Sequence, residues 1–426
     1  MSETLGKAKV WKKAKKSGKI DIPRSVYIHI PFCRRRCYYC DFPISVLGDR
    51  PNNGTSAWIE EYFKVLCREI EITPVLGKPL ETVFFGGGTP SLSTVQQIEH
   101  TLKAIDKHFG MVSDAEISME IDPGTFNLQQ LRGYLHTGVN RFSLGVQAFQ
   151  DELLQVCGRS HSLDDIFVAV DLIRQVNIPN FSLDLISGLP HQTLQQWQHS
   201  LETAIKIAPD HISCYDLTIE PVTAFGRKYR SGSKPLPKDE MTATMYRVAG
   251  ETLTGAGYEH YEISNYAKPG YQCRHNRVYW ENRSYYAFGM GAASYVAGQR
   301  FTRPRTRKEY YAWVETLIEA GGAIDSPHNT SIDNLLETLM LGLRLAEGVD
   351  ISAIASMFGE ETLNNIWDCL QPYYRQGWVE AIDRDNNSVS IEENENVLQV
   401  DRIRLTDPEG FLFSNTVLAD LFDRLG

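Results

Sequence analysis

The chain has 426 residues, of which 42% are hydrophobic and 23% charged, and its formal net charge is −10. This composition is ordinary for a soluble globular protein with room for two or three domains. No run of about 18 apolar residues occurs, so no membrane span is expected. Eight cysteines are too few for a secreted disulfide scaffold of this length. We therefore expect a protein of the reducing cytoplasm.

Residues 1–24 carry seven lysines and Arg24 against two acidic residues, Glu3 and Asp21. No apolar core follows them, so they are not a secretory signal. We expect a basic flexible tail in solvent, with transient contact to anionic lipid or to an acidic partner as the alternative. The remaining chain has a clear acidic excess, which argues against nucleic acid as a partner.

A cysteine motif with the spacing C-x3-C-x2-C follows the first predicted strand, at Cys33, Cys37 and Cys40. Three thiolates can hold a four-iron cluster and leave one iron open for a cofactor that receives an electron. A zinc site is one alternative, but structural zinc takes four protein ligands, and neither His29 nor Asp41 completes a standard pattern. Three unrelated buried thiols are the other alternative.

Strands and amphipathic helices alternate over residues 25–220. The expected strands cover residues 26–30, 82–86, 116–122, 141–147, 181–187 and 212–218, and the clearest helices cover 57–72, 163–176 and 193–207. Six strand–helix units predict a parallel sheet, and in such sheets the sites lie at the carboxyl ends of the strands.

One face of three expected strands is polar. It comprises Ser118, Glu120 and Asp122, then Ser143, Gly145 and Gln147, then Ser182 and Asp184. Buried polar groups without partners cost about 1–3 kcal/mol each, so this face predicts a cofactor cavity inside a partial barrel. The second strand runs into a glycine-rich turn at residues 86–91, where backbone groups can approach a ligand closely.

Residues 25 to about 220 resemble the radical S-adenosylmethionine (SAM) superfamily, in the cysteine motif, its aromatic residue before the last cysteine, and the turn. The resemblance implies a partial (β/α)6 barrel in which Cys33, Cys37 and Cys40 ligate a 4Fe-4S cluster whose fourth iron is chelated by SAM. It implies that Tyr39 supports the adenine, with Tyr27 against the same ligand. It further implies that Gly87, Gly88 and Thr89 meet the SAM amino group, that Glu120 is the anionic partner of that group, that Gln147 and Asp184 bind ribose hydroxyls, and that Arg159 binds the carboxylate.

Residues 221–325 are predicted to extend the barrel, with a helix at 238–255. They contain the segment His275-Asn276-x-x-Tyr279-Trp280, which sets a histidine beside aromatic side chains, as a haem site needs. A hydrogen-bonded core histidine is the alternative, and Cys273 is a rival haem ligand. The arginines at 300, 303, 305 and 307 could pair with haem propionates, or form a solvated run.

Residues 326–426 predict a small, mainly helical module that resembles a winged helix. Amphipathic helices precede a β-ribbon expected at 389–400, and a helix with Leu418, Leu421 and Phe422 closes the chain. Eighteen acidic and six basic residues argue against DNA binding. We expect this module to cover the barrel mouth or to dock a partner.

Taken whole, the chain resembles the oxygen-independent coproporphyrinogen III oxidase family, and more closely its haem-chaperone (HemW-type) branch. The enzyme branch continues its motif with one more cysteine two residues on, where this chain has Phe42. The haem-binding segment, at His275, Asn276, Tyr279 and Trp280, is the second feature of the chaperone branch. The resemblance therefore implies a haem chaperone that holds a SAM-bound cluster and transfers haem to acceptor haemoproteins.

The alternative implied by the resemblance is an enzyme that cleaves SAM to a radical and decarboxylates coproporphyrinogen. An electron donor is a further partner that the family leaves open, and Arg34, Arg35 and Arg36 could steer it or porphyrin carboxylates to the cysteine loop. A solvated loop is the equal alternative. A dimer also stays open, because no heptad pattern declares one.

Overall fold

The structure is a computed structural model that describes residues 21–49, 53–324, 329–385, 387–391 and 397–426, with the backbone alone at 53–55. Most of the predicted basic tail thus lies outside the described residues. The chain forms two compact units. The first comprises residues up to 184, 218–231 and 283–328, and the second comprises 185–217, 232–282 and 329–426. No helix in the described ranges is long and apolar enough to cross a membrane.

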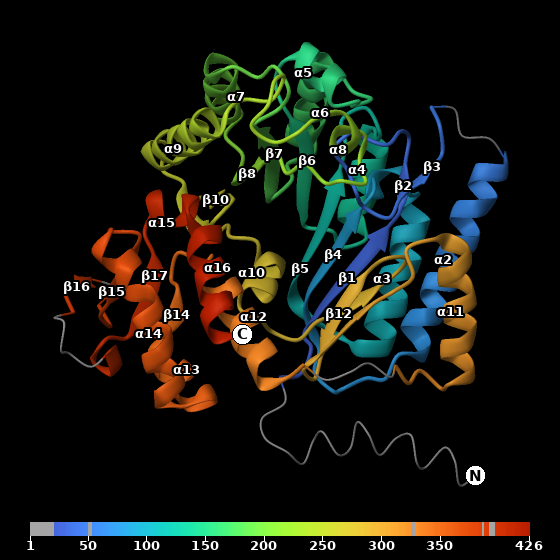
Figure 1. Cartoon of the computed structure of the whole chain (residues 1–426). Helices are drawn as coiled ribbons and strands as arrows, with labels where there is room; N and C mark the ends of the chain where they lie inside the picture. The colour runs from blue at the N-terminus through green and yellow to red at the C-terminus, as the bar shows by residue number, and fades with distance from the viewer. Residues whose placement is uncertain (1–20, 50–52, 325–328, 386, 392–396) are drawn as a thin grey trace, which may run out of the picture. The chain divides into compact units, whose positions relative to one another are not determined.

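Parallel strands form the sheet of the first unit, in the order β11, β1, β4, β5, β6 and the first half of β7. The printed registers from β11 to β6 are all parallel, and Figure 1 shows β1, β4 and β5 side by side. The bounds are Tyr286–Phe288 (β11), Ser25–Ile30 (β1), Leu80–Gly87 (β4), Met111–Ile121 (β5), Arg141–Gln147 (β6) and Phe181–Ser187 (β7). In β1, alternate residues Val26, Ile28 and Ile30 are fully buried, as strand geometry requires.

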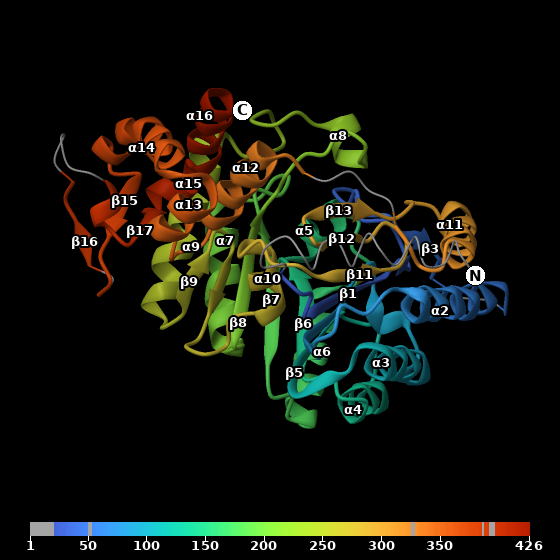
Figure 2. The same cartoon turned by 90° about the horizontal axis from the view of Figure 1, so that it is seen from below.

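Helices after the strands pack against one another in the first unit, α2 on α3, α3 on α4 and α4 on α6, while α11 packs on α2 (Figure 2). Their bounds are Asn53–Ile72 (α2), Val95–Phe109 (α3), Leu128–His136 (α4), Leu163–Val176 (α6) and Arg307–Glu319 (α11). Capping boxes begin three of them, with the side chains of Thr94, Asn127 and Ser162 as N-caps.

Short elements complete the first unit. They are Phe32–Cys33 (β2), Ser45–Val46 (β3), Pro90–Leu92 (η1), Asp151–Val156 (α5), Ala224–Lys228 (α8), Ala293–Val296 (β12) and Gln299–Thr302 (β13). β2 pairs in parallel with β3, which returns the chain beside the first cysteine of the motif.

The sheet of the second unit has the order second half of β7, β8, β10 and β9. β10 is antiparallel to both of its neighbours. The elements are Leu194–Ile207 (α7), His211–Asp216 (β8), Asp239–Gly255 (α9), Glu259–Glu262 (β9), Asn265–Ala267 (β10) and Arg274–Trp280 (α10).

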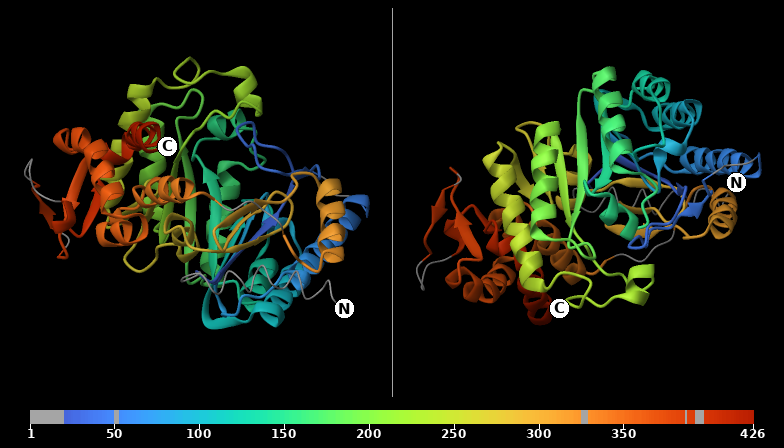
Figure 3. Two further views of the ribbon diagram at one scale, coloured as in Figure 1. Left: turned by 60° about the horizontal axis from the view of Figure 1, so that its bottom comes forward. Right: turned by 90° about the horizontal axis from the view of Figure 1, so that it is seen from above.

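The last hundred residues add helices and a small sheet, in the order β14, β17, β15 and β16, to the second unit (Figure 3, orange to red). The helices are Ser331–Gly342 (α12), Ile351–Phe358 (α13), Glu360–Arg375 (α14), Glu409–Leu412 (α15) and Ser414–Leu425 (α16). The strands are Val349–Asp350 (β14), Val379–Ile382 (β15), Ser388–Val389 (β16) and Arg402–Leu405 (β17), with one 3₁₀ turn at Val397–Gln399 (η2). Buried Leu339, Ile354 and Leu370 centre the core of this module.

The predicted α/β class, with a partial (β/α)6 barrel and a mainly helical C-terminal module, is confirmed, and within the described residues the parallel sheet is open and does not close into a barrel. β6 and β7 have the predicted bounds, whereas β4 and β5 are longer than predicted. The β-ribbon predicted at 389–400 is wrong where it can be followed, because β16 ends at Val389 and Val397–Gln399 is a 3₁₀ turn. Part of that ribbon, residues 392–396, lies outside the described residues, and the predicted domain boundaries stay predictions.

Candidate functional site

The cysteine loop leaves the carboxyl end of β1, where β2 ends at Cys33. Leu47 donates its backbone N–H to the Cys33 carbonyl at 2.8 Å, and Cys40 donates to the Cys37 carbonyl at 3.2 Å. All eight cysteines lie in the described ranges and are free, and the three of the motif are partly exposed. Burial raises the pKa of the Cys33 thiol to about 12, so a thiolate there needs a compensating cation.

Arginine side chains hold the backbone of this loop. Arg36 donates to the carbonyls of Cys40 and Phe42 at 3.2 and 3.1 Å. Arg305 donates to the Asp41 carbonyl at 2.6 Å, and Arg35 forms an exposed ion pair with Asp49. Two of the three loop arginines are therefore engaged in the fold of the loop, rather than being free in solvent.

A cavity of about 490 Å³ opens beside the cysteine loop. Cys37, Cys40 and Tyr38 line it on one side, and Thr223 and Arg227, from the segment around α8, line it on the other. This segment is fixed to the loop, because Phe225 donates its N–H to the Tyr38 carbonyl at 2.9 Å. Tyr39 packs its ring near the ring of Phe225, with the centroids 6.4 Å apart.

The glycine-rich turn lies against the start of the cysteine loop. Gly88 donates to the Ile30 carbonyl at 2.8 Å, and Thr89 donates to the Phe32 carbonyl at 2.7 Å. Gly87 has φ +108°, and a Cβ there would stand 2.3 Å from the His29 ring. Glycine is thus required by this packing as well as by any approaching ligand.

Behind the turn, His29 is held neutral between two partners. Its Nε2–H donates to the Pro43 carbonyl at 2.9 Å, and its Nδ1 accepts from the Tyr27 hydroxyl at 3.1 Å. Burial lowers the pKa of His29 to about 4. Both ring nitrogens are occupied, which agrees with the expectation that His29 does not complete a metal site.

The polar strand face converges in the structure as predicted. Glu120 accepts from the Gly87 backbone N–H at 3.0 Å, and Ser143 donates to both oxygens of Asp184 at 3.0 Å. Burial, and then the charge of Asp184, raise the pKa of Glu120 to about 8. Gln147 is buried at the end of β6 with φ +63°, and its Oε1 has no partner among the described residues.

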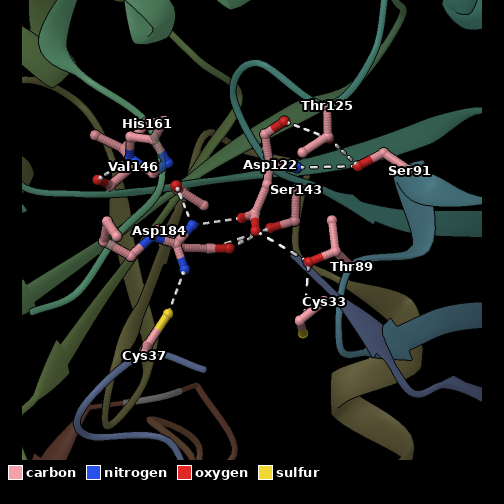
Figure 4. A network of polar contacts seen from close by, with 12 residues as sticks. Cys33, Cys37, Thr89, Ser91, Asp122, Thr125, Ser143, Val146, His161 and Asp184 are labelled. Carbon is pink, nitrogen blue, oxygen red and sulfur yellow. Dashed lines mark hydrogen bonds and ion pairs between the residues drawn. The ribbon is translucent and has the colours of Figure 1, made fainter. Parts of the chain in front are cut away.

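Asp122 lies between the glycine-rich turn and Arg159, although the sequence placed it only on the polar face. Figure 4 shows its contact with Thr89, beside Cys33. Its Oδ1 accepts from Arg159 Nη2 at 2.5 Å, and its Oδ2 accepts from the Thr89 hydroxyl at 3.2 Å. Arg159 Nη1 in turn donates to Cys37 Sγ at 3.4 Å. The signal that pointed to Asp122 was its place two residues after Glu120.

The predicted haem segment lies in the second unit, where α10 spans Arg274–Trp280. His275 is fully buried, and its Nε2 lies 2.8 Å from the Tyr279 hydroxyl one turn later. Cys273, the rival ligand, is also fully buried, whereas Asn276 and Trp280 are partly exposed. An iron bond to His275 Nε2 therefore requires the hydrogen bond to Tyr279 to break.

The arginines that were considered for propionates have other partners. Arg303 is buried and forms an ion pair with the equally buried Glu69 at 2.8 Å. Arg300 donates to the Tyr285 hydroxyl at 3.1 Å, Arg305 holds the cysteine loop, and Arg307 lies over the Trp58 ring. Arg303 is thus a core residue, and neither a solvated nor a propionate-binding one.

Comparison with known proteins agrees with this geometry. The family model of the radical SAM superfamily matches residues 27–204, and that of the HemN C-terminal domain matches 329–385. The "Heme chaperone HemW" of Synechocystis is 49% identical over 404 residues, 95% of this chain and 97% of the relative. The protein of the same name from Bacillus subtilis is 36% identical over 79% of this chain and 87% of its own.

The chain belongs to the radical SAM superfamily, in its HemW branch. A solved structure of coproporphyrinogen III oxidase (HemN) from Escherichia coli has the same fold, with a TM-score of 0.77 and 23% identity over 97% of this chain and 93% of that one. The superfamily implies a 4Fe-4S cluster and SAM as cofactors.

The donor set of the first unit fits these two cofactors chemically. Three thiols share one loop beside a cavity. Two buried polar atoms have no partner among the described residues: the acceptor Oε1 of Gln147 and the donor Nε of Arg159. Among the described residues, however, no three His, Cys, Asp or Glu side chains are already arranged to hold a metal ion.

Proposed function

We propose that the protein is a haem chaperone, which binds a SAM-bound 4Fe-4S cluster and haem and transfers the haem to acceptor haemoproteins of the cytoplasm. The observation that carries the proposal is the 49% identity to a relative named heme chaperone, which extends over nearly the full length of both chains. Similarity of this extent covers the cysteine loop, α10 and the C-terminal module together.

In this proposal Cys33, Cys37 and Cys40 are the ligands of the cluster, which supplies an iron with an open position. Two contacts and one cavity support that role. The Thr89 hydroxyl lies near Cys33, Arg159 Nη1 lies near Cys37, and the cavity lies between the loop and α8. Positive charge and hydrogen-bond donors stabilise thiolates that burial would otherwise keep protonated.

The chain's own groups then orient SAM. Burial and the charge of Asp184 raise the pKa of Glu120, so its carboxyl keeps a proton when no cation is near. A bound cation can take the place of that proton, and SAM carries two positive groups, the sulfonium and the amino group. Gly87, Gly88 and Thr89 present the backbone of the turn to the same region. Gln147 and Asp184 are the proposed ribose partners, and Arg159 is the proposed carboxylate partner, with its buried Nε lacking an acceptor among the described residues. Tyr27 and Tyr39 would supply the apolar walls.

Haem is proposed to bind at α10, with His275 as axial ligand and Asn276, Tyr279 and Trp280 beside it. The buried hydrogen bond between His275 and Tyr279 means that binding includes a local rearrangement of this turn. Apolar residues of the same helix, such as buried Val278, would have to keep the rest of the helix in place.

The test is an anaerobic haem titration of the reconstituted protein, read at the Soret band. We expect saturable, equimolar binding that His275→Ala abolishes and that His260→Ala, a change of another buried histidine in the second unit, retains. Circular dichroism of each variant verifies folding. Haem binding of His275→Ala with unchanged affinity would contradict the proposed site at α10.

The competing function is coproporphyrinogen decarboxylation, which the resemblance to the oxidase family raised. We expect none from the reconstituted protein with SAM and a reductant, because Phe42 replaces the cysteine that follows the motif in the enzyme branch. Formation of protoporphyrinogen would make the enzyme the better description.

A further inference from the structure

The backbone of Asp122 is fixed from two sides at the end of β5. Its N–H donates to the Ser91 hydroxyl at 3.2 Å, and its carbonyl accepts from the Thr125 hydroxyl at 2.6 Å. Ser91 and Thr125 also bond each other at 2.6 Å. These hydrogen bonds fix the backbone from which the Asp122 side chain extends toward the glycine-rich turn (Figure 4).

Each oxygen of this carboxylate accepts a hydrogen bond from a group that also lies beside a cysteine of the motif. Oδ2 accepts from the Thr89 hydroxyl, whose oxygen lies 3.7 Å from Cys33 Sγ. Oδ1 accepts from Arg159 Nη2, while Nη1 of the same guanidinium lies 3.4 Å from Cys37 Sγ. Asp122 thus touches neither sulfur, but connects the groups beside two of them.

The neighbouring strand leaves room for this arrangement. A Cβ on Gly145 of β6 would stand 2.6 Å from Asp122 Oδ1 and 3.3 Å from Arg159 Nη2. The Gly145 carbonyl accepts a second hydrogen bond from Arg159 Nη2 at 3.2 Å. A side chain at this position would displace the ion pair, so the glycine of β6 supports the observed geometry of Asp122 and Arg159 independently of their own contacts.

Arg159 is held in this place although it is not fully satisfied there. Its side chain is 9% exposed, and Nε has no hydrogen-bond partner among the described residues. Asp122, at 23% side-chain exposure, supplies the counter-charge that keeps the guanidinium buried beside Cys37. Asp122 is thus the carboxylate partner of a guanidinium whose Nε remains without an acceptor among the described residues.

We propose that Asp122 is a positioning residue for the iron–sulfur cluster, which holds Arg159 so that the Cys37 sulfur receives a hydrogen bond and fixes the Thr89 hydroxyl beside Cys33. This inference rests on the proposed ligation of the cluster by the three cysteines. Groups that contact metal ligands from behind fix their orientation, and hydrogen bonds to cluster sulfurs set the reduction potential. The third sulfur, of Cys40, lies outside this arrangement.

The experiment compares Asp122→Asn, Thr89→Val and their double variant after anaerobic reconstitution. An asparagine turns one acceptor into a donor and removes the negative charge that pairs with Arg159, so the hold on the two partners is weakened. We expect each variant to lose iron to a chelator about 10- to 100-fold faster than the unmodified protein. The double variant should be little worse than either single variant, and the midpoint potential of the cluster should change in the same non-additive way.

Controls separate this role from a merely structural one. Thr89→Ser retains the hydroxyl and should restore both iron retention and potential, while Glu99→Gln removes one carboxylate charge from an exposed ion pair with Lys103 and should change neither. An unchanged potential in Asp122→Asn, or additive effects of the two changes, would overturn the inference, even if the thermal stability falls. Failure of haem binding alone would count against the proposed function and leave these results standing.

Discussion

His275 and Tyr279 share a hydrogen bond of 2.8 Å across one turn of α10, with their rings perpendicular and the histidine fully buried. This contact occupies the nitrogen that an iron would need. If His275 Nε2 binds the haem iron, as proposed, this hydrogen bond must break first. The Tyr279 hydroxyl therefore opposes haem binding.

Tyr279→Phe should accordingly raise the affinity for haem. The net contribution of one such hydrogen bond is about 0.5–1.5 kcal/mol, which corresponds to a roughly 2- to 10-fold lower dissociation constant in a Soret titration. Tyr246→Phe, which removes a hydroxyl bonded to the Ile263 carbonyl in the same unit, serves as the control and should leave the affinity unchanged. A weaker affinity in Tyr279→Phe would mean that the hydroxyl assists binding instead.

Cys37→Ala should abolish the cluster and, with it, the binding of SAM. Two thiolates cannot hold the cluster in a loop whose third ligand is missing, and SAM loses the iron that it would chelate. Iron content, the broad visible absorption and a SAM titration measure this outcome. Cys67→Ala, outside the loop on α2, should retain all three, and a Cys37 variant with full iron would show that the ligand set is wrong.

Arg303→Ala should destabilise the first unit strongly, since the ion pair with Glu69 is almost fully buried on both sides. Glu69 also accepts hydrogen bonds from the Tyr310 hydroxyl and the Gly289 N–H, so removing the arginine leaves a buried charge without its main partner. Breaking a buried pair costs about 3–5 kcal/mol. Arg68→Ala is the matched control: Arg68 precedes Glu69 on α2, and its ion pair with Glu315 is exposed, so its loss should change the stability little.

Chemical denaturation of the cofactor-free protein measures both changes. Equal effects of Arg303→Ala and Arg68→Ala would contradict the role of burial. Retained stability of Arg303→Ala would also reopen the possibility that this arginine serves a ligand.

Much of the fold was predictable from periodicity, and the exceptions have physical reasons. β6 and β7 alternate apolar and small polar residues between clear breaks, so both ends were predicted to the residue. β11 was missed because three aromatic and small residues carry no period of their own, and their strand exists through pairing with distant β1.

For the site, the sequence predicted which residues share a strand face, but not which side chains from different elements meet. Asp122 shares its face with Glu120, and yet its partner Arg159 follows α5, 37 residues later. The burial of His275 was open for the same reason, because a histidine between polar and aromatic residues suits both a surface and a core. Arg303 is committed to Glu69, which is 234 residues away in the sequence.

Arg159→Lys should weaken SAM without removing the cluster, because an ammonium cannot replace the planar fork of a guanidinium. We expect at least a 10-fold higher dissociation constant by equilibrium dialysis, with iron content unchanged. Decarboxylated SAM, which lacks the group that Arg159 is proposed to bind, should bind equally well to both forms. An equal loss for both ligands would assign Arg159 to the structure of the site and not to the carboxylate.

The pH dependence of stability should reveal Glu120 in the cofactor-free protein. Its folded-state pKa of about 8 lies above the ordinary value of 4.5, so the folded protein binds the extra proton and loses stability as the pH rises toward 8. The slope is at most about 1.4 kcal/mol per pH unit for each such group. Buried Glu262 of the second unit has a similarly raised pKa of about 8 and should contribute in the same direction.

Denaturation of the unmodified protein and of two variants between pH 6.5 and 8 isolates these carboxyls. His29 and His161, whose pKa values burial lowers to about 4 from the ordinary 6.5, take up protons only in the unfolded state, so their contribution has the opposite sign and is common to all three proteins. Glu120→Gln and Glu262→Gln should each flatten the curve. SAM separates the two, since its amino group, the proposed partner of Glu120, favours the ionised form of that residue. The affinity for SAM should therefore rise with pH in the unmodified protein and in Glu262→Gln, but not in Glu120→Gln. An unchanged pH dependence of SAM binding in Glu120→Gln would remove Glu120 from the cofactor site, while the stability slope would still report its burial.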